Sequence, residues 1–302
     1  MFTQTLIQVV KLFLFMLLGY VLSVKKILPK ETPKCFSMFL VWLACPALYI
    51  YTFATQFSPQ MLSESARLIG ISLICLAAAL LLSILLKRAV SKDAYSQAVF
   101  TYSVCVPNFG YVGNVLVLAL LGETALMKYQ IFVMPVTVFM VTRGYAMLLE
   151  RKTGIKGLLN PMIIAMLAGM TIGLLQIKLP QFVLETLVSA SDCMGPVSMT
   201  LAGCVIAGFD LKKILSLKEI YITVGIKMIA MPALVILLSR VITMPAEYLS
   251  LLLLFQTLPV GLNSVVYPST IGKDCSFGAG LAVISNVAAL ITIPLFLAYL
   301  GL

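Results

Sequence analysis

The sequence predicts an all-α polytopic membrane protein with ten transmembrane helices arranged as two inverted five-helix repeats. Its composition, the distribution of its loop charges and a recurrence of Gly and Pro landmarks support this prediction. Of the 302 residues, 61% are hydrophobic and 11% are charged, and the mean hydropathy is +1.08. Soluble domains are about 45–50% apolar and about 25% charged. We therefore expect a chain embedded in a lipid bilayer.

The apolar segments are long enough to cross a membrane, which takes about 20 helical residues. The first segment has no basic residues before it and no small-x-small cleavage motif after it, so we interpret it as a retained span rather than a signal peptide. The predicted spans, numbered 1 to 10, are 5–24, 35–55, 66–86, 94–121, 128–149, 161–177, 181–209, 218–239, 246–271 and 277–300.

A short basic segment, 150–160, divides the chain into a first repeat, 1–149, and a second repeat, 161–302. It ends in Asn160-Pro161, a pattern typical of a helix start. We expect it to be a cytoplasmic linker.

Loop charges predict the topology. Loops after the even-numbered spans hold only Arg67, Lys128, Lys178 and Arg240, whereas most of the 21 Lys and Arg residues lie in loops after the odd-numbered spans. Cytoplasmic loops are enriched in Lys and Arg. The odd loops are therefore predicted to be cytoplasmic and both termini external, as in a multi-pass plasma-membrane protein. The net charge of +10 belongs to these loops and does not indicate a nucleic-acid partner.

Five landmarks of the first half recur in order in the second half, 150 to 152 residues later. Each half has five spans, an odd number, so the second half enters from the opposite side of the membrane. Such inverted repeats are frequent in secondary transporters. The landmark pairs are Gly19 and Gly169, Leu28-Pro29 and Leu179-Pro180, Pro46 and Pro196, Pro107 and Pro259, and Gly122 and Gly272.

One landmark pair predicts two interrupted helices. Span 4 contains C-V-P-N-F-G-Y-V-G-N, residues 105–114, and span 9 contains L-P-V-G-L-N, residues 258–263. A proline removes a backbone donor, and an irregular backbone inside a bilayer is tolerated where protein or a cavity covers it. Two half-helix N-termini facing one spot suit an anion. The alternative is a pair of kinks that only aid packing. The candidate substrate-binding residues are Pro107, Asn108, Gly110, Asn114, Pro259, Gly261, Asn263 and Ser264.

Three of the ionisable residues within predicted spans are candidates for function, because a charge inside a membrane is costly and often functional. Lys227 in span 8 is either an attractor for an anion, a charge that moves during transport, or the partner of Asp192 in span 7. Arg143 lies near the cytoplasmic end of span 5, where its side chain can also extend to the interface.

Several activities are excluded. The chain has no His, its seven Cys are scattered without a C-x-x-C pair, and it contains no G-x-x-x-x-G-K-[ST] motif. We therefore expect no enzyme activity, no cofactor and no metal site, and no ATP-driven transport by this chain alone.

The two interrupted segments and the C-terminal block, which runs from L-P-V-G-L-N-S-V-V-Y through I-G-K-D-C to I-S-N-V-A-A-L-I-T-I-P-L, resemble the auxin efflux carrier family. The resemblance covers the whole chain. It implies the ten-span fold of the sodium/proton antiporter NhaA, with broken helices 4 and 9 crossing at Pro107, Asn108, Pro259 and Asn263. It also implies a scaffold of spans 1, 2, 6 and 7, often dimeric, and a mobile transport unit of spans 3–5 and 8–10. The long central loop of the plant exporters is absent.

We therefore expect a secondary transporter or permease of small organic anions, such as mono- or dicarboxylates or auxin-like acids. It would work by an elevator mechanism as a homodimer, and coupling to H⁺ or Na⁺ is left open. One alternative is a cation or proton antiporter, although spans 4 and 9 carry no carboxylate at the crossing. A transporter-like membrane sensor is the other.

Overall fold

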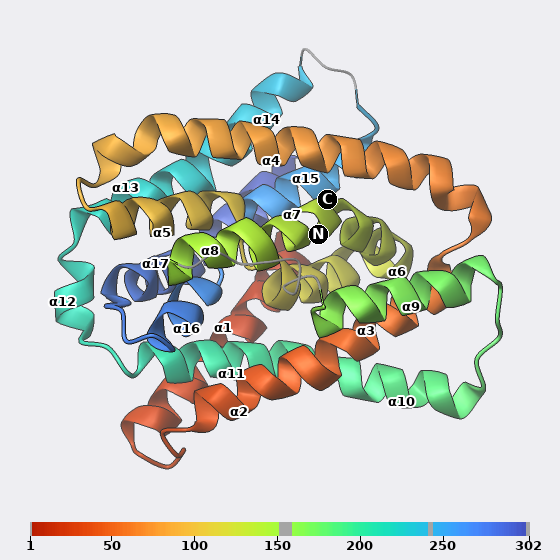
Figure 1. The fold of residues 1–302 in the computed structure, drawn as a ribbon, viewed down its shortest axis with the longest axis horizontal. Coiled ribbons are helices and arrows are strands. Elements are labelled where there is room, and N and C mark those ends of the chain that lie inside the picture. Colours follow the sequence, from red (N-terminus) through yellow and green to blue (C-terminus); the bar gives the residue numbers. More distant parts are fainter. Residues whose placement is uncertain (1, 151–158, 241–243, 300–302) are drawn as a thin grey trace.

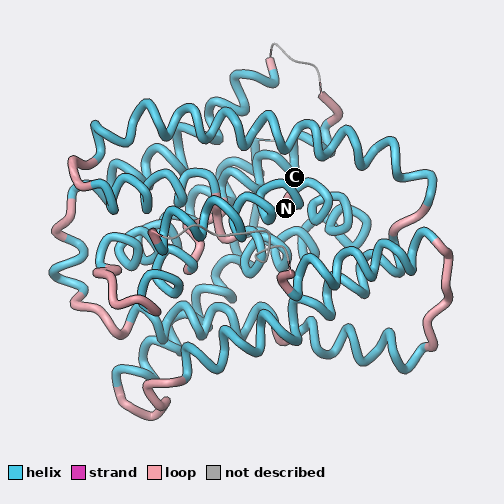
Figure 2. The backbone as a smooth tube through the Cα atoms, in the orientation of Figure 1, coloured by secondary structure: helices cyan, strands magenta, loops and turns pink. Residues whose placement is uncertain are grey.

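The computed structural model describes residues 2–150, 159–240 and 244–299, and these residues fold almost entirely into helices (Figures 1 and 2). Residues 151–158 of the predicted linker lie outside the described residues, as do residue 1 and residues 300–302 at the ends of the predicted repeats. Within the described ranges, six helices are long and apolar enough to cross a membrane. They are Thr5–Val24, Thr32–Gln56, Pro59–Val90, Phe109–Phe132, Lys218–Ser239 and Ser276–Tyr299.

The first half of the chain begins with one unbroken helix and continues with helices that are divided by wider turns. Its elements are α1 (Phe2–Val24), α2 (Thr32–Phe39), the π-helical turn η1 (Leu40–Ala44), α3 (Cys45–Gln56), the 3₁₀ turn η2 (Pro59–Met61), α4 (Leu62–Val90), α5 (Ala94–Cys105), the π-helical turn η3 (Phe109–Gly113), α6 (Asn114–Phe132), α7 (Met134–Phe139), the π-helical turn η4 (Met140–Gly144) and α8 (Tyr145–Leu149).

The second half also contains divided helices. Its elements are α9 (Pro161–Leu174), α10 (Gln181–Asp192), α11 (Met194–Ile206), α12 (Leu211–Leu215), α13 (Lys218–Gly225), the π-helical turn η6 (Ile226–Ala230), α14 (Met231–Ser239), α15 (Ala246–Thr257), α16 (Asn263–Ser269) and α17 (Ser276–Tyr299).

Proline explains where several helices widen. Pro46 follows η1 and Pro232 follows η6, each at the second residue of the next helix. A proline lacks the N–H that would close the preceding helical turn, so a single wider turn forms without ending the helix. These turns change the direction in which the next side chains point, and Lys227 lies in one of them.

Positive backbone φ angles occur at positions 150 residues apart. Gly122 and Gly272 have φ of 85° and 70°, and Lys26 and Gln176 have φ of 57° and 52°. Gly122 divides α6, so the helix that contains residues 128–149 begins earlier than the sequence predicts. The two halves thus turn in the same conformation at matching places.

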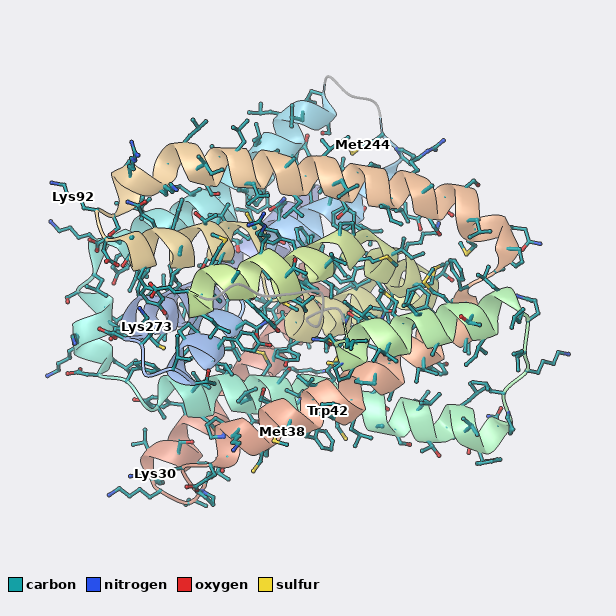
Figure 3. The ribbon with its side chains drawn as sticks, viewed as in Figure 1. Lys30, Met38, Trp42, Lys92, Met244 and Lys273 are labelled. Atoms are coloured by element: carbon teal, nitrogen blue, oxygen red, sulfur yellow. The ribbon has the colours of Figure 1, made fainter. Side chains whose placement is uncertain are left out.

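Helices from the two halves of the chain pack against one another. α1 packs on α11 and on α17, α3 packs on α9, and α4 packs on α5. α4 runs along one long edge of the molecule and α2 with α10 along the opposite edge, while the shorter helices fill the space between them (Figure 1). Figure 3 shows Lys30, Lys92 and Lys273 toward the same end of the molecule. These lysines come from three of the loops that the sequence assigns to one side of the membrane.

Candidate functional site

The two interrupted helices meet backbone to backbone. Pro107 and Val260 form an antiparallel bridge, and the Asn108 amide N–H donates to the Pro259 carbonyl at 2.7 Å. Neither helix continues past its proline, because α5 ends at Cys105 and α15 ends at Thr257. The two breaks therefore lie side by side and run in opposite directions.

The first break is a tight turn built around Pro107. Its carbonyl accepts from the Phe109 N–H at 2.8 Å, and the Asn108 carbonyl accepts from the N–H groups of Val112 and Gly113 at 3.1 and 3.0 Å. Asn108 itself has φ −76° and ψ 53°, outside the helical range. The chain thus restarts a helix directly after Asn108, and the side chain of Asn108 stays at the turn.

The second break is fastened to the last helix. The Val260 N–H donates to the Ser285 Oγ of α17 at 3.0 Å. The Ser264 Oγ donates to the Gly261 carbonyl at 2.9 Å, and the Asn114 Nδ2 makes the corresponding bond to the Gly110 carbonyl at 2.9 Å. The side chains of Ser264 and Asn114, two predicted site residues, therefore donate hydrogen bonds to glycine carbonyls in the two breaks.

A pocket of about 400 Å³, part of it open to solvent, lies on one side of the crossing. Five predicted residues line it: Pro107, Asn108, Gly110, Gly261 and Asn263. Six others were not predicted as site residues: Phe109, Tyr111, Met140, Met162, Leu262 and Tyr267. None of the lining residues is charged, and the walls are mainly apolar and aromatic. Such a lining with a few polar groups is typical of small-molecule sites.

The two carboxamides in this pocket differ in their bonding. Asn108 is only 5% exposed, and its side chain forms no hydrogen bond with any residue that the structure describes. The Asn263 Nδ2 donates to the Met140 Sδ at 3.2 Å. A buried amide without a partner is unfavourable. Asn108 is therefore available to a bound solute.

Tyr267 forms part of the pocket wall and is held by Tyr145. Their hydroxyl groups are hydrogen-bonded, and their ring centroids lie 4.1 Å apart at 50°. Tyr267 lies one helical turn after Asn263, and this spacing is the sequence signal that could have identified it. The two tyrosines come from α16 and α8, so the sequence alone does not pair them.

Pro259, also predicted as a site residue, lies outside this pocket. It lines a second pocket of about 260 Å³, whose other residues include Val112, Ala289 and Asn286. The two pockets share no lining residue. They are separated by the paired backbone of the two breaks.

The buried Lys227 bonds to Gln256. The Lys227 side chain is fully buried, and its Nζ donates to the Gln256 Oε1 at 2.9 Å and to the Gln256 carbonyl at 3.3 Å. It also lies 5.6 Å from the centroid of the Phe255 ring. Lys227 therefore contacts the last turn of α15, three residues before Pro259, rather than the pocket itself.

Asp192 and Arg143, the other two charged candidates, are both exposed. Asp192 ends α10 and does not pair with Lys227, so the ion pair that the sequence left open is not formed. Span 7 is divided at Cys193, which places Asp192 at a helix end instead of deep inside a continuous helix. Arg143 lies in η4.

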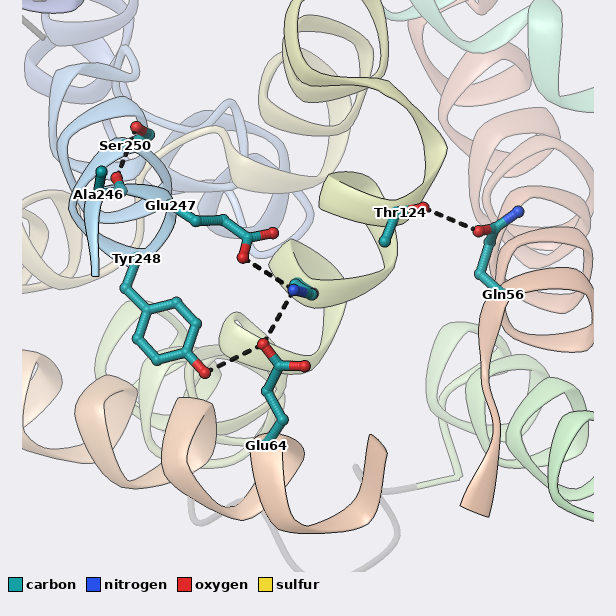
Figure 4. A network of polar contacts seen from close by, with 8 residues as sticks. Gln56, Glu64, Thr124, Ala246, Glu247, Tyr248 and Ser250 are labelled. Atoms are coloured by element: carbon teal, nitrogen blue, oxygen red, sulfur yellow. Dashed lines mark hydrogen bonds and ion pairs between the residues drawn. The ribbon is translucent and has the colours of Figure 1, made fainter. Parts of the chain in front are cut away.

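A polar network joins segments that are distant in the sequence (Figure 4). Lys128 forms ion pairs with Glu64 at 2.9 Å and Glu247 at 2.8 Å, and the Tyr248 hydroxyl donates to Glu64 at 3.1 Å. These residues come from α6, α4 and α15. The network therefore links α4, α6 and α15 to one another.

A second set of polar contacts joins α3 to the segment after Gly122. The Glu123 carboxylate accepts from the Tyr51 hydroxyl and from the Gln56 Nε2, both at 3.1 Å. The Thr124 hydroxyl donates to the Gln56 Oε1 at 3.1 Å (Figure 4). These four side chains are referred to below as the α3 contact.

The chain is similar to a known family along nearly its whole length. The model of a family described as membrane transport protein matches residues 4–156 and matches again at residues 146–297. No curated protein matches the chain. Because the two matches together cover both halves, the chain belongs to this membrane transport family, that of the auxin efflux carriers and PIN-like proteins, and it is a membrane transporter.

Proposed function

We propose that this protein is a secondary active transporter of small organic anions that binds its substrate in the pocket beside the crossing of the two interrupted helices. The observation that carries the proposal is the unpartnered carboxamide of Asn108 in an uncharged pocket at the paired breaks. An amide N–H₂ donates to a carboxylate, and hydrogen bonds to an ionised acceptor are about twice as strong as neutral ones.

An anion fits this pocket better than a cation does. Antiport of a cation or a proton needs a carboxylate at the crossing, and no acidic side chain lines the pocket. The first turn of the helix that starts after Asn108 adds N–H groups and a partial positive charge. The aromatic and thioether walls suit the apolar body of a mono- or dicarboxylic acid, including auxin-like acids.

The proposed architecture is an inverted repeat of ten spans. It is supported by the double match of the family model, by the positive φ angles at positions 150 residues apart, and by the antiparallel pairing of the two breaks. In this arrangement α1–α3 and α9–α11 form the scaffold, and α4–α8 and α13–α17 form the transport unit. We propose a homodimer through the scaffold, where Trp42 is 69% exposed.

The proposed mechanism is alternating access by an elevator movement of the transport unit. The pocket lies near Met162, at the start of α9, and near Tyr267, which precedes the loop that holds Lys273. The positive-inside rule assigns both places to the cytoplasmic side. The second pocket then lies toward the outside, and the α3 contact closes the outer side by joining scaffold and transport unit. We also propose that the protein lies in the plasma membrane with both termini on the external side.

Uptake into proteoliposomes tests the proposal. A thermal-shift screen of mono- and dicarboxylic acids on the purified protein first selects a binding acid, and uptake of that acid is then measured. Asn108→Ala is expected to reduce uptake strongly. Asn108→Asp is expected to abolish it, because the added charge repels an anion. Asn160→Asp is the matched control, since Asp also caps α9 in place of Asn160.

The outcomes separate the three candidate functions. Normal uptake by Asn108→Asp would refute the proposed binding site. Cation-driven proton exchange that Asn108→Asp strengthens would favour an antiporter. Saturable binding of an acid without any flux would favour a sensor.

A further inference from the structure

The side-chain amide of Asn263 is held in the pocket by a thioether. Its Nδ2 lies 3.2 Å from the Met140 Sδ, and both residues line the pocket. A thioether sulfur is a weak hydrogen-bond acceptor. We propose that Met140 sets the affinity of the pocket for a carboxylate, by holding the Asn263 amide in place and giving it up to the substrate. This inference rests on the proposed function.

The position of Met140 makes it a fixed part of the pocket. It is 3% exposed and begins the π-helical turn η4, so its side chain is directed by the wider turn. Asn263 begins α16 and comes from the other half of the chain. The contact therefore joins two helices across the pocket.

The Asn263 amide gains a stronger hydrogen bond when a substrate carboxylate replaces the Met140 sulfur as its acceptor. The bond that the Asn263 amide loses is weak, whereas the bond that it gains to a carboxylate is charge-assisted. Asn108, the other amide of the pocket, has no acceptor to give up among the residues that the structure describes. Met140 is therefore the one competitor that the described residues place against these two amides.

The Tyr102 hydroxyl is a further polar group beside Asn263. The Tyr102 hydroxyl faces Asn263 and is buried without completing a hydrogen bond. Its ring packs against Gly144, where a Cβ atom would approach to 2.9 Å. Because this contact does not complete a hydrogen bond, the Met140 sulfur is the acceptor of the Asn263 amide among the described residues.

The test compares three single variants with the wild-type protein. Met140→Leu removes the sulfur and nearly conserves the volume, and Met140→Gln supplies a stronger acceptor. Met228→Leu is the matched control, because Met228 is buried in the π-helical turn η6, lines neither pocket and forms no hydrogen bond with the described residues. The probes are succinate and indole-3-acetate, and binding to the purified protein is measured by calorimetry.

We expect Met140→Leu to bind at least one probe about three- to fivefold more tightly, the equivalent of one weak hydrogen bond. Met140→Gln is expected to bind about tenfold more weakly because a full neutral hydrogen bond must be broken. Met228→Leu is expected to stay within about twofold, since Met228 lies outside both pockets and the change affects packing alone. In an Asn263→Ala background the effect of Met140→Leu should vanish, whereas an effect through packing alone would persist.

The results distinguish a failure of the role proposed for Met140 from a failure of the proposed function. If the wild-type protein binds a probe and Met140→Leu leaves the affinity unchanged or lowers it, the role of Met140 is wrong and the proposed function stands. If Met140→Leu strengthens binding equally in the Asn263→Ala background, the role of Met140 is also wrong. If the wild-type protein binds neither probe, the proposed function fails for these acids and the role of Met140 falls with it.

Discussion

Replacement of Glu123 by alanine is expected to open the outer side of the transporter. Glu123 accepts two hydrogen bonds from α3, one from the Tyr51 hydroxyl and one from the Gln56 amide, each 3.1 Å long. In the proposed elevator these bonds join the scaffold to the transport unit only in the state with a closed outer side. Their loss therefore raises the population of the opposite state.

The size of the shift follows from the two lost bonds. A hydrogen bond to a charged group is worth about 1.5–3 kcal/mol when it is well shielded. Both bonds of Glu123 are exposed to solvent, so we discount each to about 0.5–1 kcal/mol. The total of about 1–2 kcal/mol corresponds to a roughly 5- to 30-fold change in the ratio of the two states.

The assay measures how fast an impermeant thiol reagent labels the outer pathway. The seven native cysteines are replaced, and Ala289→Cys is introduced as the reporter. Ala289 is 3% exposed and lines the second pocket, so labelling is slow while the outer side is closed. Glu123→Ala is expected to raise the labelling rate roughly 5- to 30-fold, in proportion to the population shift.

A second glutamate provides the control. Glu185 is exposed on α10 and accepts from Gln181 of the same helix at 3.0 Å, so it joins no two helices. Glu185→Ala is expected to leave the labelling rate unchanged. An unchanged rate in Glu123→Ala, or an equal rise in both variants, would refute the proposed closing role of the α3 contact.

Four further predictions concern the crossing, its flanks and the start of α5. Lys227→Gln is expected to lower the melting temperature with little change in carboxylate affinity, because the buried Nζ loses its bonds to Gln256 and does not line the pocket; weaker binding in calorimetry at an unchanged melting temperature would instead give Lys227 a role in binding. Gly110→Ala should fold normally, since a Cβ there meets no atom within 4 Å, and should reduce uptake by filling the pocket. Gly113→Ala should instead lower the melting temperature, because its Cβ would collide with packed side chains. At Asp93 a hydrogen bond from the Ser96 backbone N–H lowers the pKa of the carboxyl. The stability that this cap supplies is present above the usual carboxyl pKa and is lost as pH falls through the lowered value. Thermal melts of Asp93→Asn should therefore show less loss of stability in acid than the wild type.

The sequence was sufficient to predict the features that depend on a few consecutive residues. A proline removes a helical N–H, so local chemistry favours the breaks at Pro107 and Pro259, although Pro294 lies inside α17 without ending it. The landmark glycines at 122 and 272 likewise have positive φ angles, a conformation that glycine adopts readily. The membrane environment follows from composition, and Asn108 is a candidate site residue because it is a polar residue beside a break.

Tertiary structure alone decided which side chains meet. Met140 lines the pocket and Lys227 bonds to Gln256 rather than to Asp192, yet nothing in the local sequence of Met140 or Lys227 indicates these partners. In a chain that is 61% hydrophobic, the side facing lipid and the side facing the pocket have similar residues. Hydrophobic periodicity therefore carries little information about direction. The wider turns η4 and η6 rotate Met140 and Lys227 further, and the packing of distant helices sets the direction that results.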